Sequence, residues 1–142
     1  FEINRKALQD YGNKIRKEQG VDFFARKMID IIEEGKNYVV EGFRNPGEID
    51  AFRKLRDFVL IGLTAPDELR MQWMLERKKD NDPNDLDELM AVDARDRGIG
   101  EPYYGQQSTL CYQMADAYII NNTSFEDLKL KIEQVLEELG CF

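Results

Sequence analysis

The sequence contains no histidine among its 142 residues. Histidine is the usual general base near neutral pH and the commonest zinc ligand. Hydrolytic mechanisms that pair a serine or cysteine nucleophile with histidine are therefore excluded within this chain. Cysteine is also scarce, because Cys111 and Cys141 are the only two and they form no Cys-x-x-Cys motif. We therefore expect no disulfide framework and a protein of the reducing cytoplasm.

Long apolar runs and an excess of positive charge are also missing. No run approaches the ~20 apolar residues that a membrane-spanning helix requires, and charges interrupt the first ten residues, where a secretory signal would be apolar. The 20 basic residues are outnumbered by 28 acidic ones, which gives a net charge of −8. We therefore expect neither a membrane nor a nucleic acid as partner. A small anionic ligand remains compatible, because a local arginine cluster can outweigh the global charge.

The pattern of apolar residues alternates between helical spacing and short continuous runs. Two helices are predicted first, from Asn4 to about Glu18, with Leu8 and Tyr11 on its apolar face, and from about Asp22 to Glu34. Runs rich in β-branched residues predict buried strands at 37–42, 57–63 and 117–121. Further helices are expected at 45–55, from 66 onward, at 85–96 and 106–114, and after the cap Ser124.

This alternation predicts an α/β fold of one domain, with a parallel sheet in three layers and helices on both faces. Three strands are few for such a sheet, where about 5–6 are usual. The sequence also begins with Phe1 rather than methionine, directly on a helical pattern. We therefore expect that one or two strands precede the 142 residues.

The most informative segment for function is the end of the first predicted strand. Glu41, Gly42 and Arg44 lie there, and ligands of open α/β sheets bind beyond the carboxyl ends of the strands. Glycine lets the backbone turn at that point, and an arginine can fork onto a phosphate. A plain strand exit with a solvated arginine explains the same pattern about equally well.

The segment from Tyr38 to Pro46 resembles the Asp-Gly-x-Arg strand exit of adenylate kinase-like nucleoside monophosphate kinases. The order of the other motifs is similar to that of dephospho-CoA-kinase-like and adenylate-kinase-related P-loop proteins. These motifs are the helix Arg5–Arg16, a Val-Leu-Ile-Gly strand at 59–62, Ala65–Arg70 and Ala115–Asn121. The resemblance spans nearly the whole chain.

The resemblance implies that residues 1–142 are the C-terminal portion of a P-loop nucleotide-kinase domain whose first strand is missing. Acceptor-binding helices would occupy 4–34 and a lid about 70–100. The implied activity moves the γ-phosphate of ATP, with magnesium, to a nucleoside monophosphate or a similar small phosphorylated acceptor. Such a reaction needs positive charge and alignment rather than a histidine.

The site residues implied by the resemblance are mostly arginines. Lys79 would join the lid. The groups facing the transferred phosphate would be Arg44, Arg70 and Arg77, and those binding the acceptor would be Arg5, Arg16, Glu41, Gly42 and Gln107. Gln107 and its neighbours could hydrogen-bond a base, or could serve only in packing and capping.

Departures from the family pattern leave two other hypotheses open. The sequence has no Gly-x-x-x-x-Gly-Lys-Ser/Thr phosphate-binding loop, and Trp73 stands where a lid arginine is expected. The chain could therefore be a degenerate, non-catalytic domain that senses nucleotides or mediates interactions within a larger protein. It could also be a small acidic interaction protein with an unrelated α/β fold. That last hypothesis predicts a continuous three-stranded sheet, whereas the kinase order leaves strands 37–42 and 57–63 unpaired with each other.

Overall fold

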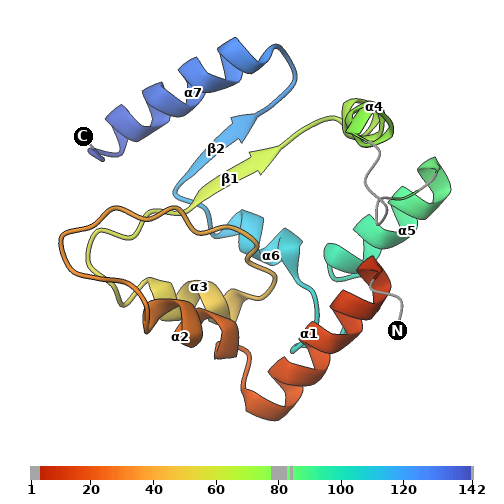
Figure 1. Cartoon of the computed structure of the whole chain (residues 1–142), viewed down its shortest axis with the longest axis horizontal. Helices are drawn as coiled ribbons and strands as arrows, with labels where there is room; N and C mark the ends of the chain where they lie inside the picture. The colour runs from red at the N-terminus through yellow and green to blue at the C-terminus, as the bar shows by residue number, and fades with distance from the viewer. Residues whose placement is uncertain (1–3, 78–82, 84, 142) are drawn as a thin grey trace.

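The structure, a computed structural model, describes residues 4–77, 83 and 85–141. Within these residues the chain forms seven α-helices and a two-stranded parallel sheet (Figure 1). The elements follow in the order α1 (Arg5–Gln19), α2 (Phe23–Ile29), α3 (Pro46–Phe52), β1 (Ile61–Thr64), α4 (Asp67–Arg77), α5 (Leu86–Asp96), α6 (Ser108–Gln113), β2 (Ala117–Ile120) and α7 (Phe125–Glu138).

The two strands run parallel, with Ile61 opposite Ala117 and Thr64 opposite Ile120. Asp116 holds the start of this ladder, because its carboxylate accepts a 2.8 Å hydrogen bond from the backbone N–H of Leu60. Hydrogen bonding lowers the pKa of the Asp116 carboxyl, and the nearby Arg53 guanidinium adds to the effect. The strands 57–63 and 117–121 predicted from the sequence are therefore confirmed in type and direction, although β1 begins four residues later than expected.

The predicted strand at 37–42 is wrong. Residues 36–44 have no regular secondary structure, and Val39 is 99% exposed. An apolar run becomes a strand only where a neighbouring strand satisfies its backbone groups, and none of the described residues supplies one. The three-layer sheet is therefore not observed, and the described part has no continuous three-stranded sheet either. The prediction of an α/β fold is confirmed, with two parallel strands in the described residues.

Helix starts follow local signals. Asn4, Asp85 and Ser124 each accept a hydrogen bond from a backbone N–H in the first turn of their helix. At α3, Asn45 and Glu48 form a complete capping box, with proline at the first helical position. The helices expected at these points are therefore confirmed, although α2 and α3 end earlier than predicted.

The apolar core lies between α2, α3 and α6 and the start of β1. One buried cluster consists of Ala25, Ala51 and Phe52, and another consists of Ile49, Leu60 and Cys111. Three phenylalanine rings connect the clusters, with centroids 5.2 Å apart for Phe43 and Phe52 and 5.4 Å apart for Phe52 and Phe58. This core fixes the segment that leads into α3, which carries Arg44.

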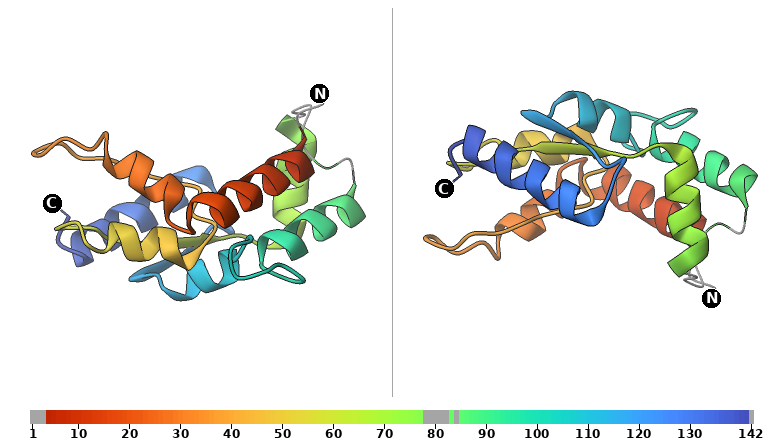
Figure 2. Two further views of the ribbon diagram at one scale, coloured as in Figure 1. Left: turned by 90° about the horizontal axis from the view of Figure 1, so that it is seen from below. Right: turned by 90° about the horizontal axis from the view of Figure 1, so that it is seen from above.

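Helix α1 buries the opposite side from the one predicted. Leu8 and Tyr11, expected to face the core, are 56% and 61% exposed, whereas Gln9, Asn13 and Arg16 are buried. These three residues are spaced by four and three positions, so they share one face of the helix. Helices α1 and α5 lie well apart from α7 (Figures 1 and 2). None of the described helices combines the length and the apolar character that a bilayer span requires.

The core makes a direct stability prediction. Ile49 is 0% exposed, so Ile49→Ala should leave a cavity and lower the free energy of unfolding by about 2–5 kcal/mol. Urea denaturation followed by circular dichroism measures the change. Ile31, which is 62% exposed, supplies the matched control, because Ile31→Ala should change stability by no more than about 0.5 kcal/mol. Equal losses in the two variants would contradict this description of the core.

Candidate functional site

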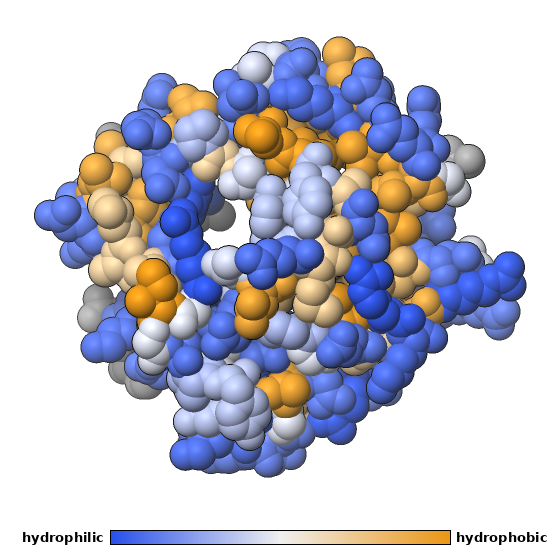
Figure 3. Space-filling model, turned by 180° about the vertical axis from the view of Figure 1, so that it is seen from behind, coloured by the Kyte–Doolittle hydropathy of each residue, from blue (hydrophilic) through white to orange (hydrophobic). Residues whose placement is uncertain are grey.

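A cavity of about 540 Å³ opens between α1, α2, α4 and α5 and the segments that precede α3 and α6. The space-filling view shows the molecule hollowed near its centre, with hydrophilic side chains along part of the rim (Figure 3). Four arginines from three parts of the chain line the cavity, namely Arg5 and Arg16 on α1, Arg44 before α3 and Arg77 on α4. Among the described lining residues the opposing charge is the carboxylate of Asp96, and Glu48 pairs with Arg16 outside the lining. The cavity is therefore cationic within an acidic chain.

The remaining lining is mixed. Leu8, Tyr11, Phe24 and Val92 contribute apolar or aromatic surface, and Gln9 and Gln106 contribute amides. A cavity with a few convergent polar groups and an apolar wall is the usual form of a small-molecule site. The arrangement suits an anion that carries an apolar or planar portion.

Arg16 is held rigidly at the cavity wall. Its Nε donates a 2.9 Å hydrogen bond to Glu48 Oε1, and the exposed fractions of the two side chains are 4% and 5%. Its Nη1 lies 3.5 Å from Asn13 Oδ1, and its guanidinium lies 5.5 Å from the centre of the Phe24 ring. These contacts come from three directions, so the plane of the guanidinium is fixed before any ligand arrives.

Arg44 is half-buried, and its guanidinium forms a 3.0 Å hydrogen bond to the backbone carbonyl of Phe43. In the part of the chain that the structure describes, no carboxylate forms an ion pair with this guanidinium. Its backbone N–H donates to Glu48 Oε2 at 2.7 Å, and its carbonyl accepts from the backbone N–H of Gln107 at 2.6 Å. The backbone of Arg44 is thus fixed on both sides while its charge lines the cavity.

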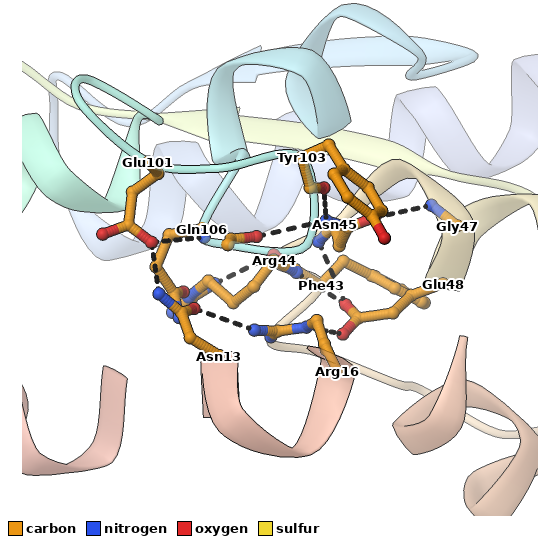
Figure 4. Close-up of polar contacts among 11 residues, drawn as sticks. Asn13, Arg16, Phe43, Arg44, Asn45, Gly47, Glu48, Glu101, Tyr103 and Gln106 are labelled. Carbon is orange, nitrogen blue, oxygen red and sulfur yellow. Dashed lines mark hydrogen bonds and ion pairs between the residues drawn. The ribbon is translucent and has the colours of Figure 1, made fainter. Parts of the chain in front are cut away.

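A polar network ties the loop at 101–107 to α1 and to the start of α3 (Figure 4). Asn45 Nδ2 donates to the carbonyls of Tyr103 and Gly105, at 2.8 and 3.1 Å. Gln106 Nε2 donates to Asn13 Oδ1 at 3.1 Å. The loop therefore contacts the same two segments that carry Arg16 and Arg44.

Glu101 completes this network. Its carboxylate accepts hydrogen bonds from Asn13 Nδ2, from the backbone N–H of Gln106 and from Arg95 Nε. Burial by itself would raise the pKa of the Glu101 carboxyl, but the hydrogen bonds from Arg95, Asn13 and Gln106 outweigh it and lower the pKa. Glu101 is therefore ionised at neutral pH.

The structure brings together four of the predicted site residues and separates the others. Arg70 does not line the cavity. It is bound by Asp93, with Nη2 donating to Oδ1 at 2.8 Å, and the hydrogen bond with Asp93 is the main cause of its raised pKa. Glu41 and Gly42 are exposed on the segment before α3, outside the lining. The roles predicted for these residues stay predictions.

Gln107 lies beside the site rather than in it, because its Nε2 donates to the carbonyl of Pro102 at 3.1 Å, while the neighbouring Gln106 lines the cavity. Lys79 lies outside the described residues. The predicted lid region about 70–100 corresponds in its described part to most of α4, to α5 and to the turn that follows.

Sequence reasoning missed Asn13, Glu48 and Glu101, which bind arginine side chains or the loop beside them. Gln106, which lines the cavity, was among the loop residues predicted to hydrogen-bond a base. A signal existed for Glu48, since asparagine followed three residues later by glutamate marks a capping box. No local sequence pattern predicts the contact between Asn13 and Glu101, because the two residues are 88 positions apart and meet only in the folded chain.

Magnesium was expected from the kinase resemblance. Among the described residues, no group of three or more cysteine, aspartate or glutamate side chains is placed to hold a metal ion. Magnesium and ATP stay expectations from the resemblance.

Comparison with known proteins finds relatives but no matching family model. A protein of Archaeoglobus fulgidus named UPF0200/UPF0201 protein is 30% identical over 146 residues, a match that covers 99% of this chain and 43% of that relative. UPF0200 proteins of Pyrococcus abyssi and Methanothrix thermoacetophila are 29% and 28% identical, and the matches cover 91% and 90% of this chain and 69% of each relative. The chain therefore spans less than half of the Archaeoglobus protein.

These relatives correct the family assignment made from the sequence. The similar proteins carry the name UPF0200, not the name of a nucleoside monophosphate kinase or a dephospho-CoA kinase. One of the strands on which the resemblance relied, at 37–42, is also not formed.

The lowered pKa of Glu101 predicts a pH-dependent contribution to stability. A carboxyl whose pKa is lowered by folding stabilises the native state above its ordinary pKa of 4.5 and loses this contribution as the pH falls through its folded pKa. Glu101→Gln should therefore lower the free energy of unfolding by about 1–3 kcal/mol at neutral pH. The difference from wild type should shrink below pH 4.5.

Urea denaturation at a series of pH values measures this difference. Glu34→Gln is the matched control, because Glu34 is exposed and its replacement should leave the stability profile unchanged. A wild-type to Glu101→Gln difference that stays constant down to about pH 3, where most carboxyl groups are protonated, would contradict the prediction.

The two cysteines should differ sharply in reactivity. Burial raises the pKa of the Cys111 thiol to about 12, and the Glu48 carboxylate adds to the shift, while Cys141 is exposed. Because the thiolate is the reactive form, a thiol reagent at about pH 8 should modify one cysteine rapidly in the folded protein and both after denaturation. Cys141→Ser should remove the fast reaction. Two fast thiols in the native protein would show that Cys111 is accessible.

Proposed function

We propose that this chain binds a small phosphorylated metabolite in the arginine-lined cavity. The observation that carries the proposal is the convergence of Arg16 and Arg44, from two distant segments, on one cavity. Arg16 is buried and oriented by Glu48 and Asn13, and Arg44 has a fixed backbone. Oriented guanidinium groups match the geometry of a phosphate, whose oxygens accept paired hydrogen bonds.

Electrostatics favour a phosphate over a monovalent anion. A phosphate monoester carries about −1.5 to −2 charges at pH 7. The described lining holds four arginines and the carboxylate of Asp96, and arginine remains in excess after the pairing of Arg16 with Glu48 is counted. The surrounding chain has a net charge of −8, which would repel an anion that met the general surface. Binding should therefore depend on the cavity itself and should weaken as salt increases.

The rest of the lining points to a ligand that also has an apolar or planar part. Tyr11 and Phe24 offer aromatic surface, and Gln106 places an amide at the wall. A nucleoside monophosphate combines a phosphate with a planar base of this kind. We therefore take nucleotides as the first class of ligand to test.

A more specific version of this proposal adds phosphoryl transfer from a donor such as ATP to the bound ligand. Transfer would need a site for the donor phosphates, and the 142 residues contain no Gly-x-x-x-x-Gly-Lys-Ser/Thr loop. That site would have to come from residues outside this chain. Binding without transfer, as in a nucleotide sensor, needs only the residues described above.

Replacing Arg44 should test the binding proposal. Arg44→Gln removes a charged donor from the cavity wall, so Kd for a bound nucleoside monophosphate should rise about 10–100-fold, as expected for hydrogen bonds to a charged group. Isothermal titration calorimetry with adenosine, cytidine, guanosine and uridine monophosphates measures the change. The corresponding nucleosides should bind far more weakly than the monophosphates.

The control is Arg56→Gln. Arg56 is exposed, pairs with Asp57 at 3.4 Å and lies outside the cavity lining, so its replacement should leave Kd unchanged. The proposal is abandoned if none of the four nucleoside monophosphates binds the wild-type protein, or if Arg44→Gln and Arg56→Gln bind the ligand equally well.

A further inference from the structure

Glu48 connects the two arginines on which the proposed site depends. Its Oε1 accepts the hydrogen bond from Arg16 Nε at 2.9 Å, and its Oε2 accepts from the backbone N–H of Arg44 at 2.7 Å and of Asn45 at 3.2 Å. One carboxylate thus contacts the side chain of Arg16 and the backbone of Arg44 (Figure 4). Glu48 itself does not line the cavity.

These contacts do more than begin a helix. A capping box needs the glutamate to accept only from the backbone N–H of the capping residue, here Asn45. The additional bonds to Arg16 and to the Arg44 N–H use both carboxylate oxygens and join α1 to the start of α3. The charge of Glu48 also compensates the buried charge of Arg16, which would otherwise carry a large desolvation cost.

The carboxylate of Glu48 is therefore a buried negative charge beside a cavity that is proposed to bind an anion. By charge alone, Glu48 opposes the ligand. Its position is explained if alignment outweighs this repulsion, because a forked phosphate contact requires each guanidinium to lie in a narrow range of orientation.

We infer that Glu48 is a positioning residue that aligns Arg16 and Arg44 for a shared phosphate, without touching the ligand. This inference rests on the proposed function. It predicts that loss of the Glu48 charge weakens ligand binding mainly through Arg16, because a glutamine at position 48 keeps one oxygen that can still accept from the backbone N–H of Arg44.

A double-mutant cycle tests the inference. The nucleoside monophosphate that binds the wild-type protein most tightly is titrated into four proteins: wild type, Glu48→Gln, Arg16→Gln and the double variant. Glu48→Gln should raise Kd about tenfold in the wild-type background and by less than about twofold in the Arg16→Gln background. Glu18→Gln, an exposed substitution on α1, is the matched control and should leave Kd unchanged.

A second variant keeps the test decisive if Glu48→Gln does not fold. Glu48→Asp retains the charge but is one methylene shorter. We expect it to keep the contacts with the Arg44 and Asn45 amides, which are close in sequence, and to lose the contact with Arg16 on α1. It should fold and still bind more weakly than wild type. The Arg16 Nε–H resonance provides a readout without ligand, since it should be protected from exchange in the wild type and unprotected in Glu48→Asp.

The outcomes separate the two proposals. If the wild-type protein binds no monophosphate, the proposed function fails and this inference fails with it. If the wild type binds but both Glu48 variants retain its Kd, or if Glu48→Gln weakens binding equally with and without Arg16, the inference alone is overturned. Glu48 would then serve only to cap α3.

Discussion

The arrangement of this molecule depends on the buried ion pair between Arg16 and Glu48. Taking two charges out of water is costly, and the cost is offset only when geometry is good and the remaining polar atoms are satisfied. Here the second carboxylate oxygen of Glu48 accepts hydrogen bonds from two backbone N–H groups. The side chains of Asn13 and Phe24 contact the guanidinium of Arg16. The pair therefore joins α1 to the start of α3 beside the cavity.

The same constraint explains why α1 buries a polar face. A helix packed on an apolar core would turn Leu8 and Tyr11 inward, but here Asn13 and Arg16 face inward and meet Gln106 and Glu48. The inner surface of α1 is thus specified by hydrogen bonds, which demand particular partners at particular distances. Leu8 and Tyr11 remain available to the cavity, which they help to line.

Sequence reasoning succeeded where the determinants are local. Asn45 followed by proline marked the start of α3, and Ser124 marked that of α7, because caps act within one helical turn. It failed at 37–42, since a strand exists only with a partner that local pattern does not reveal. For the site, resemblance drew attention to Arg16 and Arg44, but the contact between Asn13 and Glu101 joins residues 88 positions apart and could not be read from either neighbourhood.

Gly47 lies in the first turn of α3, where its backbone N–H donates to the side chain of Asn45. The space around it limits which residues this position can accept. A Cβ at this position would collide with the side chain of Val21, and would lie 3.1 Å from Val21 Cβ. Positions 21 and 47 therefore behave as one steric unit. A larger residue at position 47 therefore requires the side chain at position 21 to shift or to become smaller.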